Sequence, residues 1–252
     1  MTDDTSPSTT EPTRKKRRRR RRRGKGSGSE TTATQTTTTT SAEDADEADE
    51  ADEAPPRRKR VVPADVALDP TIFDLDQTFA DLGLREDLLA GIDAAGFTHP
   101  THVQAKLIPM ALAGRDILGQ SKTGTGKTAA FGLPAMHLVN ADDSFAVLVL
   151  SPTRELAIQT AHEMRELGRQ TDLSVVAVYG GQRMSMQIEK LKKRPTIIVG
   201  TPGRVMDMHQ RGFLPYDSIR LAVLDEADRM LDIGFRDDIR KILGRAPKSR
   251  QT

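Results

Sequence analysis

Cysteine is absent from the 252-residue sequence. Its absence excludes disulfides, thiolate metal sites and a cysteine nucleophile. The five histidines show no metal-ligand spacing, so no zinc site is expected. No apolar run approaches the roughly 18 residues that a membrane-spanning helix requires. A secretory signal is not expected either, because acidic residues open the chain and a basic block follows. The sequence therefore predicts a cytoplasmic protein with no membrane partner.

Large apolar side chains are scarce in the first 60 residues, which cannot bury enough surface to offset the entropy lost on ordering. We predict a disordered low-complexity tail over residues 1–60, a linker over 61–78 and a folded domain over 79–252. The tail is built from segments of biased composition: a basic block (14–23), a threonine-rich stretch (31–40), an acidic stretch (43–53) and a short basic patch (57–60).

The net charge of +2 hides an uneven distribution of charge. Residues 1–60 hold 15 Lys or Arg and 12 Asp or Glu, whereas the remainder holds 23 and 24. The basic block would neutralise several phosphates and add salt-sensitive affinity for RNA or DNA. The alternative is a solvated tail that partly pairs with its own acidic stretch.

From residue 79 onward, short apolar segments alternate with helical patterns, which predicts an α/β fold. Leu82, Leu84, Leu88, Leu89 and Ile92 fit one helical face, and further helices are expected near 101–113, 127–138, 154–168, 184–192, 203–210 and 235–243. Strands are expected near 116–119, 145–150, 174–179, 196–199 and 221–224. The alternation predicts a parallel sheet with helices on both faces and ligands at the carboxyl ends of the strands.

A glycine-rich segment joins the first predicted strand to a helix. It consists of Ser121, Lys122, Thr123, Gly124, Thr125, Gly126, Lys127 and Thr128. The spacing is that of a Walker A phosphate loop, in which Lys127 would contact the β and γ phosphates and the Thr128 hydroxyl would bind Mg²⁺. The alternative is an ordinary glycine-rich turn.

Two carboxylates end the last predicted strand, where Leu224 is followed by Asp225 and Glu226. A buried strand that delivers one Asp to a magnesium ion is the Walker B arrangement. Glu226 would then orient or deprotonate the attacking water. With Lys127, these two residues form the predicted catalytic group, and Thr128 and Asp225 are the predicted Mg²⁺ ligands.

Residues 225–228 spell Asp-Glu-Ala-Asp, and over 79–252 the sequence resembles the DEAD-box RNA helicase family. The resemblance implies the first RecA-like P-loop NTPase domain of that family, with ATP and Mg²⁺ as cofactors and RNA as partner. It also implies that Asp228 couples the motifs to one another. Ser121 fits the family's phosphate loop, whereas Lys122 stands where the family usually has Gln.

The segment Gly96-Phe97-Thr98-x-Pro100-Thr101-x-x-Gln104 resembles the family's adenine-recognition motif, with Phe79 as the isolated upstream aromatic. A Gln amide can accept from adenine N6 and donate to N7, whereas guanine would mispair with it. ATP preference is therefore implied. Without the resemblance, Gln104 would be an ordinary polar helix residue and Phe97 a core residue.

Three short motifs resemble the family's RNA-backbone contacts: Pro152-Thr153-Arg154, Gly180-Gly181 and Thr201-Pro202-Gly203-Arg204. Two of them follow a strand and begin a helix, where unpaired N–H groups and a hydroxyl suit phosphate oxygens. Contacts of this kind hold RNA without reading its sequence. The alternative is plain helix capping with Pro in the first turn.

The resemblance also implies parts beyond this sequence, namely a strand with a Ser-Ala-Thr motif and a second RecA-like domain. We therefore expect a truncated product or incomplete record whose first domain lacks its last strand and hydrolyses little ATP alone. The leading hypothesis is an ATP-dependent RNA helicase that unwinds or remodels short duplexes. The alternatives are a non-catalytic RNA-binding module acting through its basic tail and, less favoured, another P-loop ATPase.

Overall fold

A computed structural model describes residues 68–121 and 124–252. The predicted tail over 1–60, residues 61–67 of the predicted linker, and Lys122 and Thr123 of the predicted phosphate loop lie outside the described residues. No helix in the described ranges combines the length and the apolar character of a membrane span.

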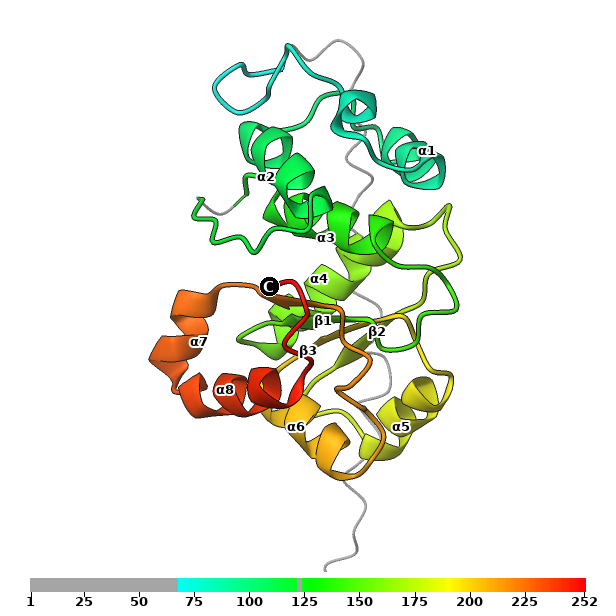
Figure 1. Cartoon of the computed structure of the whole chain (residues 1–252), viewed down its shortest axis with the longest axis vertical. Coiled ribbons are helices and arrows are strands. Elements are labelled where there is room, and N and C mark those ends of the chain that lie inside the picture. Colours follow the sequence, from blue (N-terminus) through cyan, green and yellow to red (C-terminus); the bar gives the residue numbers. More distant parts are fainter. Residues whose placement is uncertain (1–67, 122–123) are drawn as a thin grey trace, which may run out of the picture. The chain divides into compact units, whose positions relative to one another are not determined.

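Helices and strands alternate along the described chain (Figure 1). Those before the sheet are η1 (Phe79–Leu82), α1 (Glu86–Ala94), α2 (His102–Leu112) and α3 (Lys127–His137). The sheet and its connections follow as β1 (Val147–Leu150), α4 (Arg154–Leu167), β2 (Val175–Val178), α5 (Met184–Lys192), β3 (Ile197–Gly200), α6 (Pro202–Gln210), β4 (Leu221–Leu224), α7 (Ala227–Ile233) and α8 (Arg236–Arg245).

The four strands form one parallel sheet in the order β2-β3-β1-β4. Leu150 lies opposite both Gly200 and Leu224, and Val178 lies opposite Gly200. The strands therefore end level with one another, and we call this line of strand ends the carboxyl edge. The predicted α/β architecture is confirmed, and four of the five predicted strands form within a residue or two of their expected bounds.

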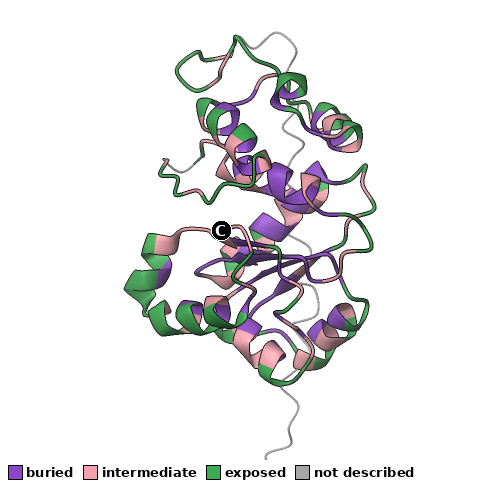
Figure 2. Ribbon diagram, viewed as in Figure 1, coloured by how far each residue is buried: buried purple, intermediate pink, exposed green. Residues whose placement is uncertain are grey.

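Alternate residues of each strand face two hydrophobic layers, because side chains in a strand point to opposite faces. Val147 and Val149 of β1 pack with residues of α3 and α4, whereas Leu148 and Leu150 pack with residues of α6 and α8. The strands are buried almost throughout, and helices cover both faces of the sheet (Figure 2). Full burial of each such side chain contributes roughly 1.5–3 kcal/mol.

The predicted strand at 116–119 does not form, and this prediction is wrong for the structure. Between this segment and β4 lie Gln251 and Thr252: Gln251 bridges Leu221, and the Ile117 N–H donates to Thr252 O at 2.9 Å. A strand needs a continuous ladder of backbone partners, and two residues supply too few. The Leu118 side chain is accordingly fully exposed.

Two helical predictions also need correction. The single face expected over Leu82 to Ile92 is divided into η1 and α1, because Gly83 adopts a left-handed conformation with φ of +77°. Helix α7 was not predicted. It begins directly after Glu226 and buries only Met230 along its length, so its apolar pattern is too weak to mark it in the sequence.

Part of the predicted linker is attached to the folded domain. Phe73 forms an antiparallel bridge with Thr101, and the Asp74 N–H donates to Pro100 O at 2.9 Å. The segment just before α2 is thereby held on both sides, which fixes the residues that the sequence assigns to adenine recognition.

Candidate functional site

The predicted motifs that follow strands lie along the carboxyl edge. Glu226 and Asp225 follow β4, residues 152–154 follow β1, residues 201–204 follow β3, and residues 180–181 follow β2. Because the strand order is β2-β3-β1-β4, the acidic pair occupies one end of the edge and the three predicted RNA motifs occupy the rest. Sequence order alone does not give this spatial order.

The phosphate loop ends at the first turn of α3. Gly124 and Gly126 have φ of +83° and +79°, a left-handed conformation that only glycine adopts readily. Lys127 is the first residue of α3, and its Nζ lies 3.3 Å from Ser121 O across the loop. The helix N-terminus adds unpaired N–H groups and a partial positive charge at the same place. The described part of the loop thus has the geometry expected of an anion site.

Gln104 connects α2 to this loop instead of facing solvent. Its Oε1 accepts from the Thr101 N–H at 2.9 Å, and its Nε2 donates to Gly126 O at 3.0 Å. The Thr101 hydroxyl donates to Thr125 O at 2.9 Å. Both ends of the Gln104 amide are therefore engaged with backbone, and its predicted pairing with adenine stays a prediction that requires these bonds to be exchanged.

The two aromatic residues of the predicted adenine site lie in different environments. The Phe97 side chain is 48% exposed, so its ring is accessible to a ligand. Phe79 is only 5% exposed and packs in the core beside Leu82 and Leu88. Contact between Phe79 and a nucleotide stays a prediction that this burial does not favour, and the observed role of the ring is packing.

Asp225 extends from β4 into a half-buried position, and its N–H donates to Leu150 O at 2.9 Å. Burial raises the pKa of the Asp225 carboxyl, the neighbouring Glu226 raises it further, and the positive charge of Lys127 opposes the rise. A desolvated carboxylate of this kind favours a nearby cation. Asp225 and the hydroxyl-bearing Thr128 on α3 are therefore a donor set that fits Mg²⁺ accompanied by a triphosphate.

Glu226 occupies a strained backbone position at the start of α7. Its φ of +49° is left-handed, which is uncommon for a residue with a side chain. Its carboxylate pairs with the Arg229 guanidinium at 3.2 Å, while the Asp228 carboxylate accepts from the Arg229 N–H at 2.9 Å. Sequence reasoning missed Arg229, although its place three residues after Glu226 in a helical turn is a usable signal.

The motif after β1 contains one residue with a structural role and one whose side chain extends over a neighbouring ring. The Thr153 hydroxyl accepts from the Leu156 N–H at 3.3 Å and so caps α4, as the capping alternative expects. Arg154 extends over the Tyr179 ring, with 5.3 Å between its Cζ and the ring centroid. Tyr179 directly precedes Gly180 and was not singled out in the sequence.

The motif after β3 begins α6 with Pro202 in the first turn. The Thr201 hydroxyl makes no capping bond there. Arg204 is 15% exposed, and its Nη1 donates to Gln182 O at 3.3 Å while its Nε lies 4.0 Å from Asp207. The Arg204 guanidinium therefore contacts the protein on two sides, and its predicted role as a charge presented to RNA stays a prediction.

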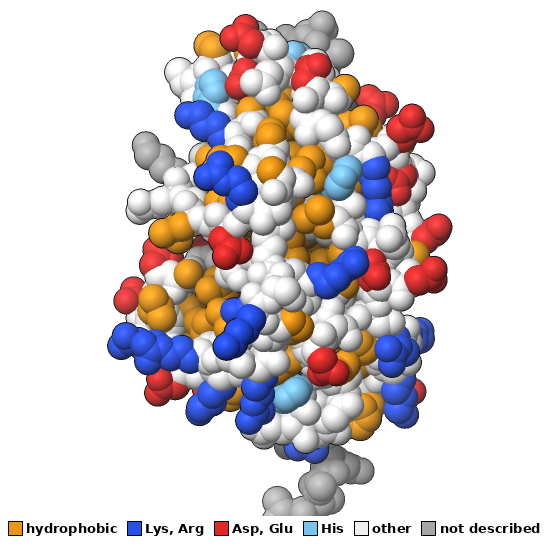
Figure 3. All heavy atoms as spheres, viewed as in Figure 1, with side chains coloured by type: hydrophobic (Ala, Val, Ile, Leu, Met, Phe, Trp, Pro, Cys, Tyr) orange, Lys and Arg blue, Asp and Glu red, His pale blue; other side chains and the backbone are white. Residues whose placement is uncertain are grey.

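Charge is unevenly spread over the face in Figure 3. Lys and Arg side chains gather over α5, α6 and α8, whereas Asp and Glu gather over the first described residues and α1. The basic part is the half of the molecule that holds the motifs after β2 and β3, which is the arrangement a polyanion would favour.

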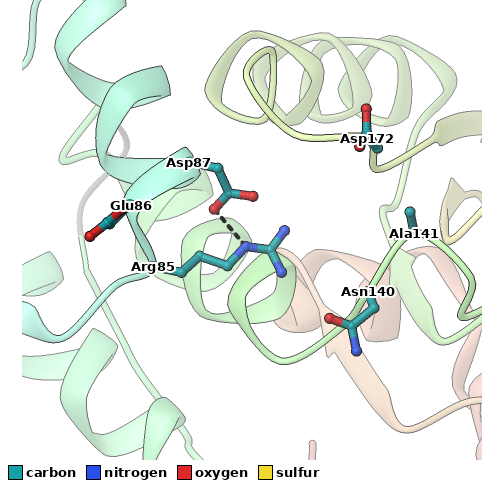
Figure 4. A pocket seen from close by; sticks show the side chains of 6 residues that line it. All are labelled: Arg85, Glu86, Asp87, Asn140, Ala141 and Asp172. Atoms are coloured by element: carbon teal, nitrogen blue, oxygen red, sulfur yellow. Dashed lines mark hydrogen bonds and ion pairs between the residues drawn. The ribbon is translucent and has the colours of Figure 1, made fainter.

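A shallow pocket lies elsewhere, between the start of α1 and the segment after α3 (Figure 4). Its lining combines an Arg85–Asp87 ion pair at 2.7 Å with two more carboxylates, the full set being Arg85, Glu86, Asp87, Asn140, Ala141 and Asp172. It contains none of the predicted site residues, and its excess of acidic groups does not suit a phosphate.

The fold and the loop define a RecA-like P-loop domain, and comparison with known proteins specifies the family. The DEAD/DEAH box helicase family profile matches residues 101–252. The chain belongs to this family, which confirms the resemblance drawn from the motifs.

Two similar curated proteins and two solved structures illustrate the relationship. The chain is 48% identical over 176 residues to the DEAD-box ATP-dependent RNA helicase CshA of Geobacillus kaustophilus, covering 69% of this chain and 38% of that protein. It is 48% identical over 178 residues to the RNA helicase CrhR of Synechocystis, covering 71% and 36%. The chain thus spans little more than a third of the curated relatives it matches.

The solved structures agree in fold. A DEAD box protein from Methanococcus jannaschii matches with a TM-score of 0.66 and 41% identity, covering 69% of this chain and 48% of that one. The S. cerevisiae protein Dbp5, solved bound to Gle1 and IP6, matches with a TM-score of 0.62 and 35% identity, covering 69% and 45%.

Proposed function

We propose that this chain supplies the ATP-binding site and part of the RNA-binding site of an ATP-dependent RNA helicase that unwinds or remodels short duplexes. The observation that carries the proposal is the carboxyl edge. It brings the acidic pair after β4 into line with three motifs suited to a nucleic-acid backbone. The names of the relatives, which include ATP-dependent RNA helicases, support the same activity.

At the nucleotide, each residue has a separable task. Lys127 and the N-terminus of α3 would offset the charge of the β and γ phosphates, the loop N–H groups would hold their oxygens, and Thr128 and Asp225 would hold Mg²⁺. The metal, when bound, neutralises charge that develops between the β and γ phosphates. Glu226 would orient the attacking water and accept its proton.

ATP would be selected over GTP by Gln104 and Phe97. The Gln104 amide presents one donor and one acceptor, which match adenine and mispair with guanine. The exposed Phe97 ring offers an apolar surface to the base. The bond from Gln104 to Gly126 O would link the occupancy of the base site to the conformation of the phosphate loop.

RNA would be held through its phosphates and sugars by the residues at the ends of β1, β2 and β3, without recognition of its sequence. Thr201 and the N-terminus of α6 supply a hydroxyl and N–H groups, and Arg154 supplies a positive charge. The basic block of the tail would add affinity of the same unspecific kind.

The direct test is nucleotide binding by the 252-residue chain, measured with a fluorescent ATP analogue in the presence of Mg²⁺. Lys127→Ala is expected to weaken binding at least tenfold, because a charge-assisted phosphate contact contributes roughly 1.5–3 kcal/mol. Lys241→Ala removes the same charge from an exposed position on α8 and is the matched control. Equal affinity of the two variants would contradict the proposed ATP site.

A further inference from the structure

The loop between β2 and α5 lies beneath the side chain of Arg154. The guanidinium stands over the Tyr179 ring at 5.3 Å. At Gly181, which has φ of +88°, an added Cβ would lie 3.0 Å from Arg154 Nη1. An aromatic ring and a bare backbone thus bound the Arg154 head group on two sides, and no larger residue fits at 181 without moving it.

The ring itself is held firmly. Tyr179 is fully buried, and its backbone exchanges two hydrogen bonds with the fully buried Gln187 of α5. Its N–H donates to Gln187 Oε1 at 3.2 Å, and Gln187 Nε2 donates to its carbonyl oxygen at 2.9 Å. On the far side of the loop, Arg204 Nη1 donates to Gln182 O at 3.3 Å. Hydrogen bonds therefore hold the loop at both ends.

The face of the Tyr179 ring, and not its hydroxyl, makes the contact. Within the described ranges the buried Tyr179 hydroxyl has no hydrogen-bond partner. Burial raises the pKa of the Tyr179 phenol, while Arg154 and Arg165 oppose the rise, so the ring stays neutral at physiological pH. A neutral ring attracts a guanidinium through its π face.

Stacking on a ring leaves the hydrogen-bond donors of a guanidinium unused, because the ring face offers no lone pairs. The Arg154 guanidinium makes no hydrogen bond to any residue in the described part of the chain, whereas Arg204 donates to Gln182 O and Arg229 pairs with Glu226. Of these three arginines at the carboxyl edge, Arg154 alone is both restrained and equipped with a full set of donors. A restrained guanidinium loses less freedom when it binds a phosphate with two parallel hydrogen bonds.

We propose that Tyr179 and Gly181 form a platform that positions the Arg154 guanidinium to bind a phosphate of single-stranded RNA. This inference rests on the proposed RNA-binding function and deepens it, since Tyr179 becomes a positioning residue that acts only through Arg154. It also gives Gly181 a physical role, which is to leave room for the guanidinium.

The test uses the full chain and a single-stranded oligouridine RNA, with binding followed by fluorescence anisotropy over a range of salt concentrations. Arg154→Ala is expected to weaken binding about tenfold and to reduce the slope of log affinity against log salt by about 0.7, the value for one phosphate on a single strand. Gly181→Ala is expected to lower the RNA affinity and the salt slope by most of the amounts expected for Arg154→Ala. Gly212→Ala is the control, because Gly212 also has a left-handed φ, of +80°, with open space around it. This variant introduces the same backbone strain and is expected to leave the RNA affinity and the salt slope unchanged.

Two tyrosine variants separate the ring from the hydroxyl. Tyr179→Phe keeps the ring face and is expected to bind RNA as the parent does, whereas Tyr179→Leu is expected to match Arg154→Ala. Because Tyr179→Leu opens space in the core, its unfolding temperature is measured first, and Gly181→Ala carries the test if the leucine variant does not fold. In the Arg154→Ala background neither Gly181→Ala nor Tyr179→Leu is expected to reduce affinity or slope further.

A second readout reports the contact without RNA. The Arg154 Nε–H resonance is expected to be shifted by the ring current in the parent and in Tyr179→Phe, and to move toward the ordinary arginine position in Gly181→Ala. Further loss of affinity in the double variants, or an Arg154 resonance without a ring-current shift, would overturn the platform alone. An Arg154→Ala variant that binds RNA like the parent would overturn the RNA role of Arg154 together with the platform, while leaving the ATP site tested by Lys127→Ala untouched.

Discussion

The side-chain amide of Gln104 donates a hydrogen bond of 3.0 Å to the carbonyl oxygen of Gly126, the residue that precedes Lys127 in the phosphate loop. The same amide accepts from the Thr101 N–H and so caps α2. One side chain therefore holds both the start of α2 and the end of the phosphate loop, two segments that are more than twenty residues apart in the chain.

Removal of the donor half of this amide is expected to loosen the loop while leaving the cap in place. Gln104→Glu keeps an oxygen for the Thr101 N–H but loses the bond to Gly126 O and sets a second oxygen against that carbonyl, so it should cost at least about 1 kcal/mol of unfolding free energy. Gln104→Ala loses both bonds and should cost about 2 kcal/mol. Urea denaturation measures both, and a Gln104→Glu variant as stable as the parent would argue against a contribution from the loop bond.

Two glycines of the phosphate loop provide a matched pair. At Gly126 an added Cβ would lie 2.3 Å from Gln104 Nε2, whereas at Gly124 no atom of the described residues beyond its chain neighbours lies within 4 Å. Both have left-handed φ values, so each alanine introduces a strain of about 1–2 kcal/mol. Gly126→Ala is expected to lose about 1 kcal/mol more than Gly124→Ala because it also displaces the Gln104 amide.

The comparison is made by thermal unfolding of both variants in one buffer. In the Gln104→Ala background the difference between the two alanine variants should shrink, because the displaced amide is no longer present. A difference that persists there would place its origin in the backbone of the loop.

Asp225→Asn is expected to stabilise the nucleotide-free domain at neutral pH while weakening binding of Mg²⁺-ATP. Burial raises the pKa of the Asp225 carboxyl above its value in the unfolded chain. The ionised form is therefore disfavoured in the folded state, and the parent loses stability as pH rises from the unfolded pKa through the folded one. An unfolding temperature higher by on the order of 2 °C is expected at pH 7.

The pH dependence provides the control. Below the unfolded pKa the parent carboxyl is protonated in both states, so the advantage of Asn should disappear there. An advantage that is independent of pH would point to packing and not to desolvation of the charge.

The basic block is expected to contribute RNA affinity that does not depend on nucleotide. Replacement of residues 14–23 by a Gly/Ser sequence should lower the salt slope of RNA binding by about 0.7 for each phosphate that the block neutralises in the parent. If the folded domain binds RNA as proposed, the remaining affinity should respond to an ATP analogue. Loss of nearly all affinity with no response to nucleotide would favour the non-catalytic RNA-binding alternative.

The sheet and most helices were predictable because their signals are local. β4 matches the expected bounds of 221–224, since a short apolar run ended by two carboxylates marks its limits, and α5 matches 184–192. The segment at 116–119 failed because pairing is not local. Its apolar pattern suits a strand, but a strand forms only where a neighbour supplies hydrogen bonds along its length.

Side-chain partners were less accessible to sequence reasoning than motif positions. The motifs assigned Arg154 and Gly181 to RNA contacts, yet nothing in the spacing indicated that a buried Tyr179 would lie beneath the guanidinium. Arg204 was assigned to RNA from its motif, and the sequence did not indicate that its guanidinium would donate to Gln182 O. Such interactions depend on side-chain rotamers and on the neighbouring loop. Both can differ between positions that carry the same motif residues.

The left-handed backbone of Glu226 sets stability against the chemistry proposed for the turn after β4. Glycine or asparagine would adopt φ of +49° with less strain, but neither carries a carboxylate. A library of this domain selected only for heat resistance should therefore enrich such residues at position 226 and drift away from hydrolysis. A library selected for turnover should keep the acid and collect its compensating substitutions elsewhere in the domain.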